Sequence, residues 1–411
     1  MRRTHAGSRR IAPCAMAAVA VVFGWTPHAA ADRVGGSNLP PSKPSLKGRI
    51  SEDGATVALV FGTSVGATTN AGPTLLAEPS GILENTIGYA QIFKTAAGRV
   101  DVSVNLANSR YMSFSEADEL SGTAAAALTH DWGGAQSSLA LTVSSGSDVE
   151  ERLTETSLVF EHAVTAGETK PYVRAEAALL QYRDLPGPAG PFQNQDDRDR
   201  ISSRVLAGLR RTLTEQITVE AGAGVDVKTY LEPTDDFGVA RDSVSLFPLI
   251  GLAYAGERAS FRAVYTPFLR LYREPLFDEA WKHGYQIEGE AKLSDEWKVF
   301  GAARYGFEET DFLIASSAYE RVMLGGITLT LPQGTLTFAA SRSWRTYDGL
   351  GLLALGRSDD KAEFAISGDL PLDKTMSLNA RVSYLAYESS FGFVETDALT
   401  AMIGMSYAVT R

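Results

Sequence analysis

The sequence holds few of the residues that build disulfides, metal centres and membrane-spanning helices. Its 411 residues include one cysteine, Cys14, and five histidines. A single cysteine excludes a disulfide framework and a cysteine-based metal site. The later histidines, His130, His162 and His283, lack the spacing of a metal-binding motif, so we expect no metal and no cofactor. After residue 32 no run of 18 apolar residues occurs, which excludes a helical membrane span there.

Basic residues are fewer than acidic residues. The chain has 38 Lys and Arg against 49 Asp and Glu, a formal net charge of −11. Four of the arginines lie within the first ten residues, so the remainder of the chain is more acidic still. Binding to nucleic acid depends on clustered basic side chains that neutralise phosphates. The composition therefore disfavours a nucleic acid as a partner.

The N-terminal region has the pattern of an export signal. Arginines at positions 2, 3, 9 and 10 precede an apolar core over 11–25, and alanines at 29–31 form a small-residue cleavage site. The apolar core is shorter than the roughly 20 residues that a spanning helix needs. We predict a signal peptide over 1–31; a twin-arginine signal and a lipoprotein signal at Cys14 stay open. Residues 32–53, rich in Pro and Gly, are expected to form a periplasmic tail or a segment that plugs a pore.

From residue 54 onward the dominant pattern has a period of two, which predicts β-strands. The segment 216–230 shows it well, because apolar residues alternate there with Thr, Glu, Gly, Asp and Lys. The predicted strands are ten to fifteen residues long, whereas strands in soluble sheets average about five to six. Strands of about 9–11 tilted residues are long enough to cross a bilayer.

Short turns alternate along the chain with longer loops that are acidic or contain Pro and Gly. The short turns are expected at 97–98, 133–134, 167–168, 214–215, 256–257, 294–295, 333–334 and 373–374. Together with a first strand at 55–65 and a last strand at 397–411, they give 18 strands, with 16 the next choice and 14 after it. This layout predicts an all-β fold over 54–411, a transmembrane antiparallel β-barrel with short periplasmic turns and long extracellular loops.

Strands of a soluble β-sandwich also alternate apolar and polar residues, so alternation alone does not show whether the apolar face points outward. Charged residues on the polar faces suit a water-filled lumen, and aromatic residues near strand ends suit interfacial girdles. These aromatics are Trp132, Tyr230, Tyr272, Trp297, Tyr305, Phe307, Trp344, Tyr384, Tyr387 and Tyr407. Over 55–411 the chain resembles Gram-negative outer-membrane β-barrels of the porin-like kind. The resemblance implies export to the outer membrane and contact with its lipids and lipopolysaccharide; a homo-oligomer stays open.

The polar faces supply the candidate functional residues. We predict that the pore is lined by Arg174, Glu176, Arg204, Glu220, Asp226, Lys228, Arg262, Arg270, Glu288, Arg304, Glu363 and Arg381. Opposed basic and acidic ladders would select small polar solutes that cross the lumen. Alternatively, the same charges pair across neighbouring strands and brace the wall.

Other functions compete with a channel. The barrel could export a polysaccharide or a surface protein, or serve a structural role without catalysis. Gly62–Gly66 matches the G-x-S-x-G pattern of serine hydrolases at Ser64, but no helical pattern follows, so we expect no enzyme. Acidic pairs at 196–197, 235–236 and 359–360 fall in predicted external loops, where solvated charge is the simpler interpretation than divalent-cation binding.

Overall fold

The computed structural model describes the chain from residue 57 to residue 410 with gaps between strands. The described residues are 57–70, 79–95, 98–113, 118–147, 152–183, 198–234, 238–274, 280–308, 315–349, 358–390 and 395–410. The predicted signal peptide (1–31) and tail (32–53) lie outside them. Among the described residues, no helix is long and apolar enough to cross a membrane.

The described chain folds into consecutive β-strands. They are β1 (Val57–Thr68), β2 (Ser80–Thr95), β3 (Gly98–Tyr111), β4 (Glu119–Asp131), β5 (Ala135–Ser147), β6 (Arg152–Val164), β7 (Thr169–Arg183), β8 (Arg200–Thr212), β9 (Ile217–Tyr230), β10 (Ser243–Ala255), β11 (Ala259–Tyr265), β12 (Phe268–Tyr272), β13 (Ala280–Lys282), β14 (Tyr285–Lys292), β15 (Trp297–Glu308), β16 (Ala315–Leu331), β17 (Gly334–Gly349), β18 (Ser358–Pro371), β19 (Met376–Ser389) and β20 (Glu395–Thr410).

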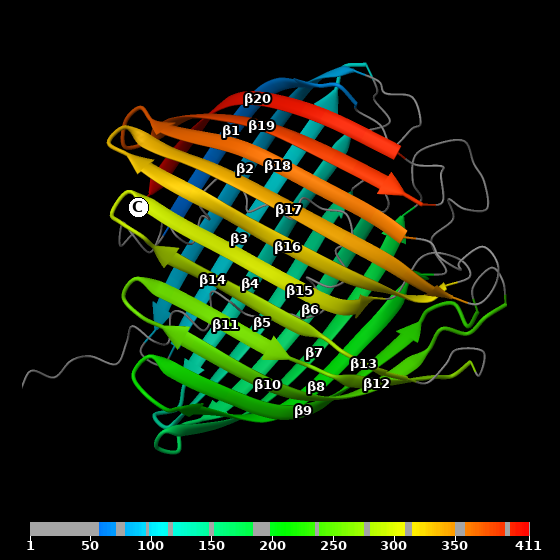
Figure 1. Ribbon diagram of the computed structural model, residues 1–411. Helices are drawn as coiled ribbons and strands as arrows, with labels where there is room; N and C mark the ends of the chain where they lie inside the picture. Colours follow the sequence, from blue (N-terminus) through cyan, green and yellow to red (C-terminus); the bar gives the residue numbers. More distant parts are fainter. Residues whose placement is uncertain are drawn as a thin grey trace, which may run out of the picture. The chain divides into compact units, whose positions relative to one another are not determined.

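The strands form one closed antiparallel sheet (Figure 1). Neighbours in the sequence pair with each other, and β20 pairs with β1 from Ala58 opposite Thr410 to Thr68 opposite Thr400. Among the described residues, closure pairs the first strand with the last and leaves no free edge strand, which a bilayer would not tolerate because its interior offers no hydrogen-bond partners.

Two of the wall strands are interrupted. Strands β11 and β12 pair with β10 in one continuous register, as β14 and β13 do with β11 and β12. Strands β11 and β12 together therefore make up one wall strand, and β13 and β14 together make up the next. The barrel has 18 wall strands. The strand number predicted from the sequence is confirmed, because short turns and alternation mark every hairpin.

The connections differ between the two ends of the barrel. At one end, two to four residues separate consecutive strands, and all eight predicted short turns lie there. At the other end up to sixteen residues separate them, as between β7 and β8. The predicted alternation of short turns and long loops is confirmed.

Three short turns share one sequence pattern, a Leu followed by Thr214, Ser294 or Asp373. In each, the side-chain oxygen of the second residue accepts the backbone N–H groups of the residues two and three positions later. Such local side-chain bonds favour turns over continued strand. The Leu N–H bonds the carbonyl at the start of the next strand, which fixes the register.

The apolar face of each strand points out of the barrel. On β10, exposed Val244, Leu246, Ile250 and Leu252 alternate with buried residues from Ser243 to Gly251. A side chain on the concave inner face is covered by its neighbours, whereas one on the convex face is not. The polar residues of the alternation therefore line the interior.

Candidate functional site: the inner wall of the barrel

All twelve predicted pore-lining residues lie on the inner face. Pairing places them opposite one another or opposite other inward residues, as with Arg204 opposite both Glu176 and Asp226, and Arg262 opposite Glu288. Asp226, Lys228 and Arg270 are almost fully buried there. A period of two suffices for this result, because one outward residue fixes the side of every other residue in its strand.

Toward the short turns, the inner wall carries an ion-pair network centred on Arg210. Its guanidinium binds Glu161 at 2.6 Å (Nη1–Oε1) and Glu220 at 3.1 Å (Nε–Oε1). Arg262 Nη2 approaches the other oxygen of Glu220 at 3.6 Å. These four side chains are 12–29% exposed, so the network is neither dry nor fully solvated. We call it the Arg210 network.

Toward the long loops, a second network is centred on Glu320 of β16. Arg304 binds one carboxylate oxygen, and Arg345 approaches the other at 3.5 Å. Beside it, Asp359 accepts hydrogen bonds from Tyr347 at 2.8 Å and from Ser389 at 2.6 Å. Charged groups in a partly dry wall are stable only when paired and hydrogen-bonded in this way.

The acidic pair 359–360 is therefore not a loop site, and that prediction is wrong. Both residues belong to β18, where alternation sends them to opposite faces. Asp359 is buried inside, whereas Asp360 lies outside and binds Arg342 with both oxygens. The pairs at 196–197 and 235–236 lie outside the described residues.

Several inner arginines rest on aromatic rings. The guanidinium of Arg210 lies 4.0 Å from the ring centre of Tyr172, and that of Arg204 lies 4.7 Å from the ring centre of Phe247. Phe247 occupies the space over Gly224, where a Cβ would lie 2.5 Å from the ring. Cation–π contact holds each guanidinium in a fixed place on the wall. Sequence alternation did not identify Tyr172 or Phe247, because contact across strands depends on register.

Charge is unevenly distributed around the inner wall. On β20, β1 and β5, the inward side chains within the described residues are uncharged, and they include Ser64, Thr68, Thr142 and Ser406. Strands β6 to β19 carry both networks and all twelve predicted residues. Strands β2 to β4 also carry inward charges, including the ion pair of Arg99 and Asp101, so the lumen has a charged arc and a narrow neutral, hydroxyl-rich arc formed by β20 and β1.

Ion pairing connects close neighbours on the wall. Arg174 approaches Glu176 at 3.6 Å, and Arg381 binds Glu363 at 3.2 Å on the adjacent strand. These contacts support the interpretation in which charges brace the wall.

Aromatic side chains gather on the outer face near the strand ends. Tyr285, Tyr305 and Tyr319 stack in a row with ring centres 5.2 and 5.9 Å apart. Trp132 at a short turn donates to Ser137, which also bonds His162. Of the ten aromatics expected in girdles, six lie outside: Trp132, Trp297, Tyr305, Trp344, Tyr384 and Tyr407.

Three of those girdle predictions are wrong. Tyr230, Tyr272 and Tyr387 point inward, and two of them are buried. Position near a strand end does not determine the face; parity within the strand does. The side chain of Phe307 lies outside the described set.

The outer face exposes many large apolar side chains, with Ile250 at 62% and Phe364 at 55% among the most exposed. A soluble protein rarely exposes so much apolar area, whereas hydrocarbon requires it. The protein is therefore a transmembrane β-barrel of the outer-membrane type.

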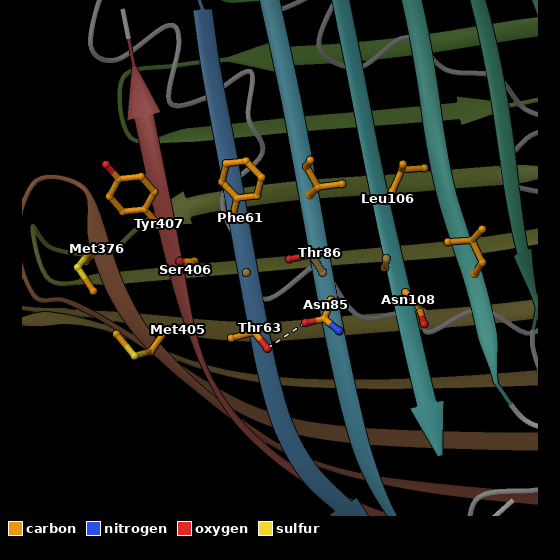
Figure 2. Close-up of a pocket in the computed structure, with 14 residues that line it drawn as sticks. Phe61, Thr63, Asn85, Thr86, Leu106, Asn108, Met376, Met405, Ser406 and Tyr407 are labelled. Atoms are coloured by element: carbon orange, nitrogen blue, oxygen red, sulfur yellow. Dashed lines mark hydrogen bonds between the residues drawn. The ribbon is translucent and has the colours of Figure 1, made fainter. Parts of the chain in front are cut away.

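One groove of about 590 Å³ marks this surface where the barrel closes. Figure 2 shows side chains of β20, β1, β2 and β3 around it, with Phe61 and Tyr407 on one side of a polar row. The row consists of Thr63, Asn85 and Asn108 on three successive strands. Thr63 donates a hydrogen bond of 3.1 Å to Asn85, which lowers the cost of exposing these groups to lipid.

The geometry required of a serine hydrolase is not present around Ser64. This residue lies within β1 and points inward. His130 and His162 both pair with Ser137 and lie on the outer face, so neither can reach Ser64. No cluster of three or more His, Cys, Asp or Glu suited to a metal occurs in the described part of the chain.

Solved structures match this chain only at very low sequence identity. OpdO of Pseudomonas aeruginosa is 11% identical, with a TM-score of 0.47 over 87% of this chain and 97% of that one. OpdK of the same organism, solved with vanillate, is 11% identical, with a TM-score of 0.48 over 87% and 99%. The siderophore receptor PirA is 8% identical, with a TM-score of 0.42 over 86% and 80%. No protein-family model and no curated protein matches the sequence.

Proposed function

We propose that the protein is an outer-membrane channel that passes small polar solutes through a charged lumen. The observation that carries the proposal is the partly exposed Arg210 network on the inner wall of an 18-stranded barrel. Barrels of about 8 strands are filled by their side chains, whereas those of 16–18 strands leave an aqueous channel. Charged side chains that retain some exposure are in contact with that water.

The lining favours hydrated solutes over apolar ones. The Arg210 network and the Glu320 network present fixed positive and negative groups at two levels of the charged arc. The neutral arc supplies hydroxyl groups that replace water around a solute. Rings and patches of such groups set selectivity in pores. In this proposal the more exposed of the twelve predicted residues, such as Arg262 and Arg381, face the solute path, and the buried ones, such as Asp226, brace the wall.

The remaining features fit export to the outer membrane. The signal peptide over 1–31 would direct the chain across the inner membrane, and cleavage would leave the tail over 32–53. The short turns would face the periplasm and the long loops the outside. Lipopolysaccharide and phospholipids would contact the apolar outer face.

Reconstitution into planar bilayers tests the proposal. We expect stepwise conductance in potassium chloride, and a shift of ion selectivity toward cations when Arg210→Met removes a positive charge from the lumen. Arg211→Met is the matched control, because Arg211 is the adjacent, exposed residue on the opposite parity. A folded barrel without conductance would contradict the channel and favour an exporter or a structural role.

A further inference from the structure

Two prolines face each other in the wall of the barrel. Pro248 lies in the middle of β10, and Pro267 lies between β11 and β12 on the neighbouring wall strand. Pairing of β10 with β11 ends at Ile250 opposite Tyr265 and resumes at Leu246 opposite Leu269. The same register on both sides places Pro248 directly opposite Pro267.

The missing pair is one that would exchange two hydrogen bonds. On one side of the gap Gly256 N–H bonds Ala259 O, and on the other Arg273 N–H bonds Asp242 O. In an antiparallel pair, alternate residues turn their backbone N–H and C=O groups toward a given neighbouring strand. These two bonds therefore show that the backbone groups of Pro248 and Pro267 are turned toward each other. Proline has no N–H, so neither bond can form.

The gap lies within the apolar belt. Leu246, Ile250 and Leu252 flank it on β10, and each is at least 44% exposed on the outer face. Backbone carbonyls without a donor are costly at this depth, because hydrocarbon offers no replacement. By contrast, Thr266 and Gly284 exchange both of their bonds on the far side of the same strand, at 2.8 and 3.0 Å. At this position the missing bonds lie at the seam between β10 and the β11–β12 strand, and not on the side of Gly284.

The inner face beside this seam is apolar, unlike the rest of the charged arc. Phe247, Leu249 and Val264 point inward there and are 5% exposed or less. Arg262 and Arg270 follow on the neighbouring strand, one toward the short turns and one toward the long loops. An apolar column that ends in guanidinium groups matches an alkyl chain with an anionic head.

We propose that the wall opens at the Pro248–Pro267 seam and passes a single-chain anionic amphiphile between the lumen and the surrounding hydrocarbon. Opening there breaks fewer backbone hydrogen bonds than at an intact ladder. The alkyl chain replaces the contacts between Leu249 on β10 and Val264 on β11 as the two wall strands separate, and the head stays with the arginines in the lumen. This route goes beyond the axial channel and is separable from it.

The test locks the seam with a disulfide. In a Cys14→Ser background, Leu249→Cys and Thr266→Cys place two thiols opposite each other on the inner face, at a position without ladder bonds, where Cβ atoms approach most closely. The control is Ala365→Cys with Ser383→Cys, an inward pair of the same type in the intact ladder of β18 and β19. The probe is N-dodecanoylglutamate, whose two carboxylates slow its spontaneous flip across a bilayer.

Full-length protein is reconstituted in liposomes that contain trapped albumin, and capture of the probe by the albumin is timed. We expect the oxidised seam pair to slow capture about tenfold or more, reduction to restore it, and the oxidised control pair to leave it unchanged. Unchanged capture after oxidation of the seam pair would overturn the proposal. So would capture by the unmodified chain that is no faster than in protein-free liposomes.

Two further measurements keep the interpretation clear. Potassium conductance of the oxidised seam pair reports the axial channel alone: its loss bears on the proposed function, whereas slowed capture with conductance retained bears on the seam. Pro248→Val with Pro267→Val restores two N–H donors, and we expect it to slow capture in the same direction without any disulfide. Capture at the unmodified rate in this variant would also count against the seam.

Discussion

Arg210 on β8 reaches across the ring of Tyr172 on β7 and binds Glu161 on β6 with both terminal nitrogens, at 2.6 and 3.3 Å. Adjacent strands are already joined by backbone hydrogen bonds, but this side-chain bridge spans three strands. The carboxylate of Glu161 also supplies the charged acceptor that the guanidinium of Arg210 needs in a partly dry wall. The same guanidinium binds Glu220 on the other side, so four strands share one cation.

Removing the cation should weaken the barrel. Arg210→Met keeps much of the contact with Tyr172 but leaves Glu161 and Glu220 without their shared donor. We expect a loss of about 1–3 kcal/mol in the free energy of unfolding. Urea titration of folding into liposomes measures it. Arg211→Met, which removes only an exposed ion pair at 3.8 Å, should change stability by less than about 0.5 kcal/mol. Equal losses in both variants would contradict the role of the Arg210 network.

The outward direction of the apolar face gives a second prediction. Val382 is 47% exposed on the outer face of β19, and the next residue, Ser383, points inward. Val382→Arg places a charge in hydrocarbon and should destabilise the barrel by about 2–4 kcal/mol. Ser383→Arg places the same charge in the lumen and should cost far less. The comparison uses folding titrations in liposomes, and a reversed order would mean that the faces are assigned the wrong way round.

The polar row in the outer groove gives a third prediction. Asn85→Leu alone removes the acceptor of Thr63 and leaves its hydroxyl facing lipid. Thr63→Val with Asn85→Leu removes both groups, so the double variant should be more stable than Asn85→Leu by about 1 kcal/mol. A double-mutant cycle with Thr63→Val alone isolates the contribution of the hydrogen bond between the two residues. A double variant less stable than Asn85→Leu would show that the groove needs Thr63.

The fourth prediction concerns pH and the turn between β18 and β19. Bonds from the N–H and hydroxyl of Thr375 and from the N–H of Met376 hold the pKa of Asp373 below its ordinary value. The ionised form therefore stabilises the turn fully above about pH 3.9, the ordinary value for Asp, and the contribution is lost as pH falls through the lower, folded pKa. We expect hydrogen-exchange protection of the Thr375 and Met376 amides to decline over this acidic range.

A hydroxyl can replace the carboxylate without titrating. Ser294 fills the corresponding position between β14 and β15, where it accepts the N–H groups of Glu296 and Trp297 at 3.2 and 3.1 Å. Asp373→Ser should therefore keep the turn and remove the pH dependence of its amide protection. Protection that declines equally in both forms would assign the effect to another group.

Much of this fold could be read from the sequence because a β-barrel repeats one simple rule. Gly133 and Gly167, both with positive φ, mark short turns, and alternation between them defines hairpins. Counting such hairpins gave the strand number. The side of Arg174, Asp226 or Arg381 followed from parity, since a strand sends successive side chains to opposite faces. The same rule, applied to Tyr230, Tyr272 and Tyr387, would have corrected the three girdle predictions, which relied on position near a strand end.

Contacts between strands could not be read in this way. That Arg210 meets Glu161 rather than Asp226 depends on the stagger of β6, β7 and β8, and that Pro248 meets Pro267 depends on the register of β10. Shifting one strand by two residues would keep every face and change every partner.

By itself, the sequence determined that the chain forms alternating strands, where they turn, and which face of each strand is polar. It did so because period and turn chemistry are local properties. Only the tertiary structure decided which charges pair, which arginines rest on aromatic rings and where the wall loses its hydrogen bonds. Those depend on distances between residues far apart in the chain, which are fixed when the sheet closes and every register is set.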